Sequence, residues 1–272
     1  MASEHGSELG AGGPWLLIGN SRWHWARGER DSLQCWHEPP AAARARLLAA
    51  AASDAAPLGW AAVGEVPADL EALLAPQRRL TLAAVPLAAM PAWLGIDRAL
   101  VGWGAWQQAQ ARGVAAVLVA DAGTVLSLTY VQGGRFAGGR LQAGAALQWR
   151  AMAAQTAQLP QLEPPAADGW AAGLAAGLDA GFGSGVDPWP QATAAAMRVG
   201  VLRGLAAAIA AAWAELPAGG HGERRELWLT GGDGPLLEPL LEPLLEPLLR
   251  SQGLGPLLHA PQLALASLAA LS

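Results

Sequence analysis

The chain has 272 residues, a formal net charge of −5 and a hydrophobic content of 53% that alanine inflates, so it suits one large domain or two moderate ones with room for a core. All 17 fixed cations are arginines, and the absence of lysine excludes a Walker-type phosphate loop and Schiff-base chemistry. The acidic balance, without any basic stripe, argues against a nucleic-acid partner.

The cysteine content and the apolar segments bear on the compartment. A single cysteine, Cys35, rules out an internal disulfide framework and fits a reducing environment. Residues 1–13 are polar and glycine-rich, lack the pattern of a signal peptide, and are expected to be disordered. The alanine-rich stretch 205–214 is too short to span a bilayer. We therefore expect a cytoplasmic protein without a membrane partner.

Residues 14–112 are expected to form a first half. Trp15–Ile18 is typical of a buried strand, and it enters a small-residue turn, Gly19-Asn20-Ser21, before a second strand. Further along, apolar runs and helical composition predict, in order, a helix over 41–52, strands over 61–66 and 80–85 with a helical segment over 69–74 between them, and an amphipathic helix over 96–111.

Residues 113–272 repeat this succession as a second half. Strands are predicted over 114–120 and 125–132, with a hairpin turn at Gly133-Gly134 leading to a short strand near 140–141. A helix over 144–158, a loop over 161–190, a long helix over 193–213 and a strand over 227–229 follow. The first strand again ends in a glycine- and hydroxyl-bearing turn, Gly123-Thr124, of the kind that lets a phosphate approach backbone N–H groups. The pattern predicts a duplicated α/β fold that holds a nucleotide between its halves.

Residues 235–249 are a low-complexity Leu-Leu-Glu-Pro repeat with proline at every fourth position. Each interior proline costs a helix about 3 kcal/mol. The repeat therefore predicts a distorted helix or an extended amphipathic segment, and a repeat expansion explains it better than a binding site.

Five ordered motifs carry a family resemblance. They are Gly95-Ile96-Asp97-Arg98, Asp121-Ala122-Gly123-Thr124, 138–144 (GGRLQAG), 156–160 (TAQLP) and 230–233 (TGGD). With them the chain resembles the type III pantothenate kinases, members of the actin, hexokinase and heat-shock-chaperone ATPase superfamily, over nearly all of residues 15–237. The resemblance implies two duplicated ribonuclease H-like (actin-like ATPase) halves with a nucleotide cleft between them. It also implies ATP-dependent phosphorylation of pantothenate to 4′-phosphopantothenate, the first step of coenzyme A biosynthesis.

The resemblance assigns the substrate residues. Asp97 would be the base that takes the proton from the substrate hydroxyl, and Gly95, Ile96, Arg98 and Thr193 would contact pantothenate. Arg98 is expected to pair with the substrate carboxylate and to hold the pKa of Asp97 down. The residues alone leave simpler roles open, because an acid or a threonine at a helix start is also a common cap.

The second motif would serve ATP and a cation. By resemblance, Gly123 and Thr124 contact the ATP phosphates, and Asp121 binds a monovalent cation, potassium or ammonium, while ATP is used with Mg²⁺. A turn-forming role for Asp121 is the alternative from residue type. The family is dimeric, and the helix over 144–158 is the candidate interface. Trp93, close to the Gly-x-Asp-Arg segment, is the tryptophan that we would test at the substrate pocket.

A further segment, residues 17–24, precedes these five motifs and departs from the family. Where Asp-x-Gly-Asn-Thr-Asn-x-Lys is usual, the chain has Leu17, Ile18, Gly19, Asn20, Ser21, Arg22, Trp23 and His24, all assigned to ATP by the resemblance. Leu17 replaces the leading carboxylate, His24 replaces the lysine, and Arg22 is the candidate substitute cation. The loss at position 17 bears on magnesium handling and leaves a second hypothesis open, a weakened relative that binds nucleotide or pantothenate as a regulatory partner. A sugar or acetate kinase of the same superfamily lacks support.

Overall fold

The structure is a computed structural model that describes residues 14–29, 32–51, 57–64, 66–162, 187–217, 223–251 and 257–272. The lead over 1–13 and most of the predicted loop over 161–190 lie outside these residues. The chain divides into a first unit, Met1–Gly104 with Gln262–Ser272, and a second unit, Ala105–Pro261. This division differs from the predicted boundary at residue 112, because it falls inside a helix and returns the last helix to the first unit. The nucleotide cleft between the two halves stays a prediction.

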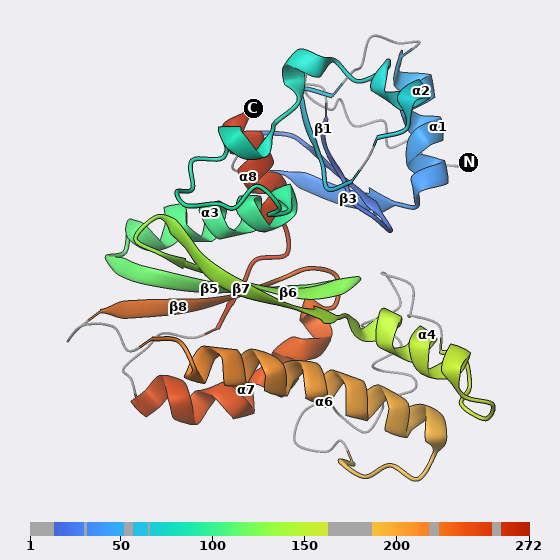
Figure 1. Ribbon diagram of the computed structural model, residues 1–272, viewed down its shortest axis with the longest axis vertical. Coiled ribbons are helices and arrows are strands. Elements are labelled where there is room, and N and C mark those ends of the chain that lie inside the picture. The colour runs from blue at the N-terminus through green and yellow to red at the C-terminus, as the bar shows by residue number, and fades with distance from the viewer. Residues whose placement is uncertain are drawn as a thin grey trace, which may run out of the picture. The chain divides into compact units, whose positions relative to one another are not determined.

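The first unit is built on a four-stranded sheet (Figure 1). Its order is β3 (Gln34–Glu38), β2 (Trp23–Arg27), β1 (Trp15–Ile18), β4 (Gly59–Ala62). The first three strands are antiparallel, and β4 is parallel to β1. Leu16 and Ile18 face a core that also takes side chains from α1 (Pro40–Ala51) and α2 (Ala68–Glu71). Helix α8 (Leu263–Leu271) contacts β1, β2 and β4.

The second unit repeats this order in a five-stranded sheet. Its strands run β7 (Arg135–Ala143), β6 (Val125–Gln132), β5 (Val114–Ala122), β8 (Arg224–Thr230), β9 (Leu258–His259). Leu118 and Ala120 of β5 face a core with α4 (Ala145–Gln155), α6 (Thr193–Ala214) and α7 (Gly234–Ser251), which lie below the sheet in Figure 1. The opposite face of the same strand carries Val117 and Val119, which are also buried.

The two sheets are topological copies, as predicted. In each, an antiparallel meander of three strands is followed by a parallel strand next to the first. The second unit adds β9 beside β8, and in the first unit a single parallel bridge, Trp60 to Arg79, takes that place. The fold is therefore the duplicated actin-like ATPase fold.

The predicted strand over 80–85 is wrong. Only Leu80 reaches the sheet, where its N–H donates to the Trp60 carbonyl oxygen at 2.7 Å, and a 3₁₀ turn, η2 (Leu82–Ala84), follows. A second 3₁₀ turn, η1 (Pro76–Arg78), precedes it. Leu80, Val85 and Leu87 are buried without being extended, because a short apolar run records burial and does not by itself specify a strand.

Most other predicted elements are confirmed with shifted ends. The helices over 41–52, 96–111, 144–158 and 193–213 correspond to α1, α3 (Ile96–Gln110), α4 and α6. The strand over 61–66 begins two residues earlier as β4, and the short strand near 140–141 is the middle of the longer β7. Strand β3, strand β9 and helix α8 were not predicted.

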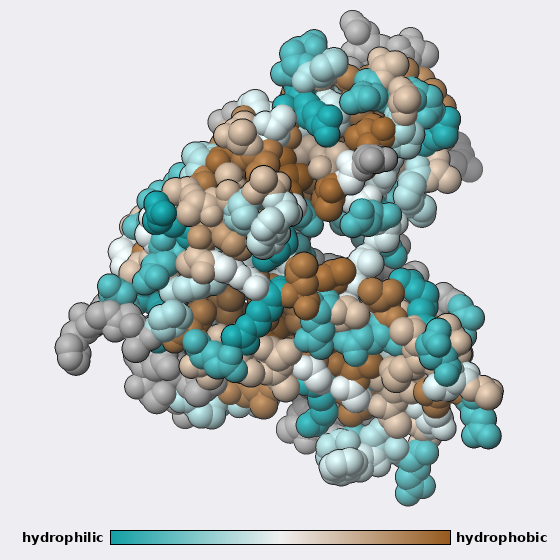
Figure 2. Space-filling model, in the orientation of Figure 1, coloured by the Kyte–Doolittle hydropathy of each residue, from teal (hydrophilic) through white to brown (hydrophobic). Residues whose placement is uncertain are grey.

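Helix α6 is long and apolar enough to cross a membrane by length and composition alone, whereas the stretch 205–214 within it is too short. It is the one described helix with these properties. Its apolar side is used inside the second unit, where Met197, Leu202, Leu205 and Ile209 are buried against the sheet and α7. Over this helix, the surface in Figure 2 is a mixture of white, tan and teal residues without a continuous brown belt. Since 39% of its most apolar stretch is buried, core packing accounts for part of this composition.

The Leu-Leu-Glu-Pro repeat forms one continuous helix, α7, with Pro239, Pro243 and Pro247 inside it. A proline donates no backbone bond, so the carbonyl groups four residues before each one lack their helical partner. The buried side of α7 consists of leucines that pack in the core with α6: Leu236, Leu237, Leu241 and Leu245. Burial of a leucine contributes about 2 kcal/mol, which is comparable with the cost of one proline. Packing thus holds the helix together.

Candidate functional site

The Gly-x-Asp-Arg motif forms the start of α3. The first helical bond runs from the Ala99 N–H to the Gly95 carbonyl oxygen at 3.1 Å. The Asp97 carboxylate turns back toward this end and accepts a hydrogen bond from the Arg98 N–H at 2.8 Å (Oδ1). A Cβ added to Gly95 would collide with the same Oδ1 atom. Only glycine at position 95 leaves room for the carboxylate in this position.

The pKa of Asp97 shifts opposite to the prediction. Burial raises it above the ordinary value of 3.8 and outweighs the opposing effects of the Arg98 N–H and the Arg98 charge. The Arg98 side chain is itself only 7% exposed, and its burial lowers its own pKa. The prediction erred because the charge of Arg98 can be seen in the sequence, while the burial of Asp97 cannot.

For the phosphoryl transfer that the family resemblance predicts with Asp97 as base, replacing Gly95 with alanine is expected to lower kcat about 100-fold, because a displacement of the carboxylate by about 1 Å is enough for such a loss. Gly204→Ala is the matched control, since it lies on α6 with open space around an added Cβ. It should leave turnover unchanged. Steady-state kinetics and thermal unfolding of both variants measure the effect. Normal turnover in a folded Gly95→Ala variant would contradict the role of this glycine.

The first glycine-bearing turn closes the β1–β2 hairpin. The Gly19 N–H donates to the Arg22 carbonyl oxygen at 3.2 Å, so this amide is already used within the turn. An added Cβ on Gly19 would lie 2.6 Å from that oxygen, which explains the glycine. Asn20, Ser21 and Arg22 form the exposed tip.

Behind this turn lies a row of side chains in which the charges of the family motif are missing. Leu17 on β1 is directly opposite His24 on β2, and His24 is opposite His37 on β3. Leu17 is 5% exposed. Burial, followed by His37 and the charge of Arg22, lowers the pKa of His24 to about 4. His24 is therefore neutral at neutral pH, and an apolar and an uncharged residue replace the aspartate and lysine of the family at two paired positions.

The second glycine-bearing turn collects three motifs in the second unit. The Gly144 N–H, at the start of α4, donates to the Thr124 carbonyl oxygen at 3.0 Å, and an added Cβ would collide with the Gly123 carbonyl group. The Asp233 N–H donates to the Ala122 carbonyl oxygen at 2.8 Å. The Gly123 N–H is itself used by the turn, as a donor to the Val125 carbonyl oxygen at 3.3 Å.

Asp121 stands at the edge of these turns. Gly231, which follows β8, has φ +89°, and a Cβ there would lie 2.6 Å from Asp121 Oδ1 and would collide with the Ala122 carbonyl oxygen. Across the sheet, Asp121 pairs with Ser127 on β6 and with Thr230 on β8. Thus the Asp-x-Gly-Thr, the Thr-Gly-Gly-Asp and the last glycine of the third motif meet at one end of this sheet.

The donors around Asp121 suit a cation of single charge. In the described part of the chain, no three histidine, cysteine, aspartate or glutamate residues come together as metal ligands. Beside the one carboxylate of Asp121 the row offers hydroxyl groups, and the Ser127 hydroxyl is buried and has no hydrogen-bond partner. Oxygen ligands with one negative charge fit potassium or ammonium better than a divalent ion.

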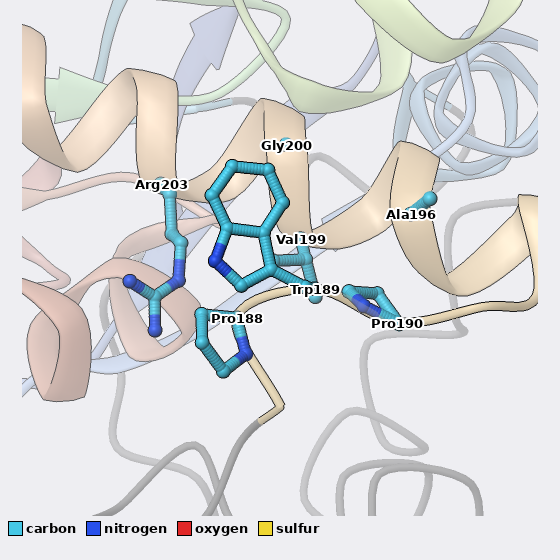
Figure 3. Close-up of a pocket in the computed structure, with 7 residues that line it drawn as sticks. All are labelled: Pro188, Trp189, Pro190, Ala196, Val199, Gly200 and Arg203. Atoms are coloured by element: carbon cyan, nitrogen blue, oxygen red, sulfur yellow. The ribbon is translucent and has the colours of Figure 1, made fainter.

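Thr193 begins α6, but it is not the cap of that helix. The N-cap position is Ala192, which makes no side-chain capping hydrogen bond. One turn further on, α6 and the segment before it line a hollow of about 520 Å³. Figure 3 shows the Trp189 ring above α6 with Arg203 beside it.

The fourth motif, residues 156–160, follows α4 and not α6. Its Thr156 hydroxyl donates to the Met152 carbonyl oxygen at the end of α4.

Comparisons with known proteins agree with the motifs. The sequence model of the family "Type III pantothenate kinase" matches residues 67–215, which include Asp97, Asp121 and Thr193. The type III pantothenate kinase of Synechococcus elongatus is 34% identical over 235 residues, which cover 82% of this chain and 85% of that protein. The chain belongs to the type III pantothenate kinase family. Its activity is the ATP-dependent phosphorylation of pantothenate, a step in coenzyme A biosynthesis.

Further relatives support the family and the fold. The type III pantothenate kinase of Thermosynechococcus vestitus is 43% identical over 159 residues, 55% of this chain and 58% of that protein. Among solved structures, the ethanolamine utilization protein EutJ from Carboxydothermus hydrogenoformans superposes with a TM-score of 0.51 at 9% identity, covering 98% of this chain and 92% of that one. At this identity the likeness concerns the fold alone.

Proposed function

We propose that Asp97 is the general base of pantothenate phosphorylation in this family member. The observation that carries this proposal is the half-buried carboxylate at the start of α3, fixed by the Arg98 N–H and given room by Gly95. The substrate hydroxyl oxygen attacks the terminal phosphorus of ATP, its proton passes to Asp97, and ADP leaves. A pKa raised by burial brings the carboxylate closer to the working pH, which favours proton acceptance over that of an ordinary aspartate.

We propose that pantothenate is bound by one charged side chain, one hydroxyl group and the backbone of two residues. Arg98 pairs with the pantothenate carboxylate, Thr193 contributes a hydroxyl, and the backbone of Gly95 and Ile96 lines the site. The exposure of Thr193 at the start of α6 supports its availability to a ligand.

The two glycine-bearing turns are proposed to hold ATP. The segment from Leu17 to His24 and the residues Gly123 and Thr124 contact the phosphates. Arg22 is the cation of the first turn, supported by its exposure and by the neutrality of His24. Mg²⁺ supplies charge neutralisation of the phosphates. With Leu17 in place of a carboxylate, the ion would be held chiefly by ATP oxygens and water.

Three further features are proposed from the family. Asp121 binds a monovalent cation, potassium or ammonium, which offsets charge near the phosphates. The protein is a homodimer with α4 in the interface, supported by the exposure of the small side chains Ala151 and Ala154. The protein acts in the cytoplasm.

A radiochemical assay tests the function and the cation together. Purified protein with ATP-Mg²⁺ and labelled pantothenate is expected to form phosphopantothenate in KCl and to form little in choline chloride of the same ionic strength. Asp121→Asn should lose the stimulation by K⁺, because the ligand loses its charge. Equal rates in the two salts would refute the cation role. The absence of product from folded protein in both salts would favour the non-catalytic relative, a reading that Leu17 and the neutral His24 support.

A further inference from the structure

Two buried hydroxyl side chains lie on the face of the second sheet that is turned away from the core with α6. On β6, Ser127 and Thr129 alternate with Leu126, Leu128 and Tyr130, and only the apolar set faces the core with α6. Ser127 and Thr129 therefore share the other face with Asp121. Ser127 is 6% exposed and Thr129 is fully buried. A polar stripe that is buried needs partners of its own.

Ser127 lacks such a partner. Its hydroxyl oxygen is buried and makes no hydrogen bond to any described residue. It lies directly across from Asp121 in the β5–β6 ladder, where opposed Cβ atoms are about 5 Å apart. A buried hydroxyl without a partner costs about 1–3 kcal/mol in principle, so its retention beside a carboxylate points to a ligand that both groups share.

We propose that the Ser127 hydroxyl oxygen is a second protein ligand of the monovalent cation held by Asp121. This inference rests on the proposed cation role of Asp121 and extends it to a strand that the motifs do not include. The oxygen of Ser127 offers its lone pairs to the ion and the Asp121 carboxylate supplies the charge. The hydroxyl adds a neutral oxygen ligand to the charge of Asp121, and oxygen ligands of this kind suit a hard cation.

Thermal unfolding at increasing KCl tests the proposal, with choline chloride holding the ionic strength constant and no nucleotide present. K⁺ should raise the Tm of the wild-type protein, because an ion that binds only the folded state stabilises it. Ser127→Ala should need about tenfold more K⁺ for the same shift, the loss that corresponds to one ligand contact. In choline chloride alone, Ser127→Ala should unfold at the wild-type temperature or above it, since the variant no longer buries a hydroxyl without a partner.

Tyr130→Phe is the matched control. Tyr130 also has a buried hydroxyl without a partner among the described residues, but it lies on the opposite face of the same strand. Tyr130→Phe should not change the response to K⁺. A response of Ser127→Ala equal to that of the wild type, in protein that forms product, would overturn the inference and leave the proposed function standing. The absence of any K⁺ response in the wild type would overturn it together with the role of Asp121.

Discussion

Asp97→Asn is expected to reduce kcat/KM for phosphopantothenate formation by at least about 100-fold, the lower end of the usual contribution of a general base. The asparagine oxygen can still accept the hydrogen bond of the Arg98 N–H, so the start of α3 should keep its geometry. The variant loses the group that accepts the proton and keeps the shape of the site. Steady-state kinetics with saturating ATP measure the loss.

The same variant has an expected signature in stability. The folded-state pKa of Asp97 lies above the ordinary value, so the folded protein holds this proton more tightly than the unfolded chain. The favourable contribution of the protonated carboxyl group is present below the unfolded pKa and is lost as the pH rises through the folded pKa. At neutral pH the charged, buried carboxylate therefore destabilises the protein, and Asp97→Asn should unfold at the wild-type temperature or above it. The difference should shrink in acid.

Two outcomes would contradict this account. One is near-normal turnover of Asp97→Asn, which would remove the base from the mechanism. The other is a kcat/KM of the wild type that stays constant as the pH falls through the raised pKa of Asp97, since a base must be ionised to accept a proton.

Leu17→Asp, which restores the carboxylate of the family motif, is expected to destabilise the protein by about 3 kcal/mol. The carboxylate would stand without a partner on a buried strand position, opposite a neutral imidazole. Adding His24→Lys in the same chain should recover more than half of the loss, because the two side chains face one another across β1 and β2 and can form an ion pair. The two losses from the family motif are therefore expected to be coupled.

A double-mutant cycle in urea measures this coupling. Leu17→Asp with His24→Gln is the control, since glutamine fills similar space without a charge, and it should recover much less stability. Equal stabilities of the Leu17→Asp/His24→Lys and Leu17→Asp/His24→Gln variants would refute the ion pair.

The sequence predicts the order of the elements and the positions of the motifs well, because glycine turns and apolar runs are local signals. It does not predict β3 (Gln34–Glu38), whose short and mixed sequence shows no clear alternation, since pairing with β2 and not composition makes this segment a strand. The predicted duplication of the fold is confirmed, because both sheets have the same strand order apart from the added β9.

The sequence identifies only those candidate site residues that belong to the motifs. Asp97 and Asp121 stand out as acids after strand or helix signals, but the raised pKa of Asp97 depends on the burial of its carboxylate, which the sequence does not show. Ser127 was missed. The alternation of Ser127 and Thr129 with apolar residues is a signal for a polar face, but only the register shows that this face belongs to Asp121.

The four-residue period of α7 limits how far such a helix can grow. Each unit advances the helix by one turn and about 40° more, so successive units rotate their leucines progressively away from α6. The first leucines of the first three pairs record this drift: Leu236 is 1% exposed, Leu240 is partly buried and Leu244 is 45% exposed, while their neighbours Leu237, Leu241 and Leu245 stay inside. Added copies would place both leucines of a pair in water, so the geometry of the helix itself sets a ceiling on the number of copies.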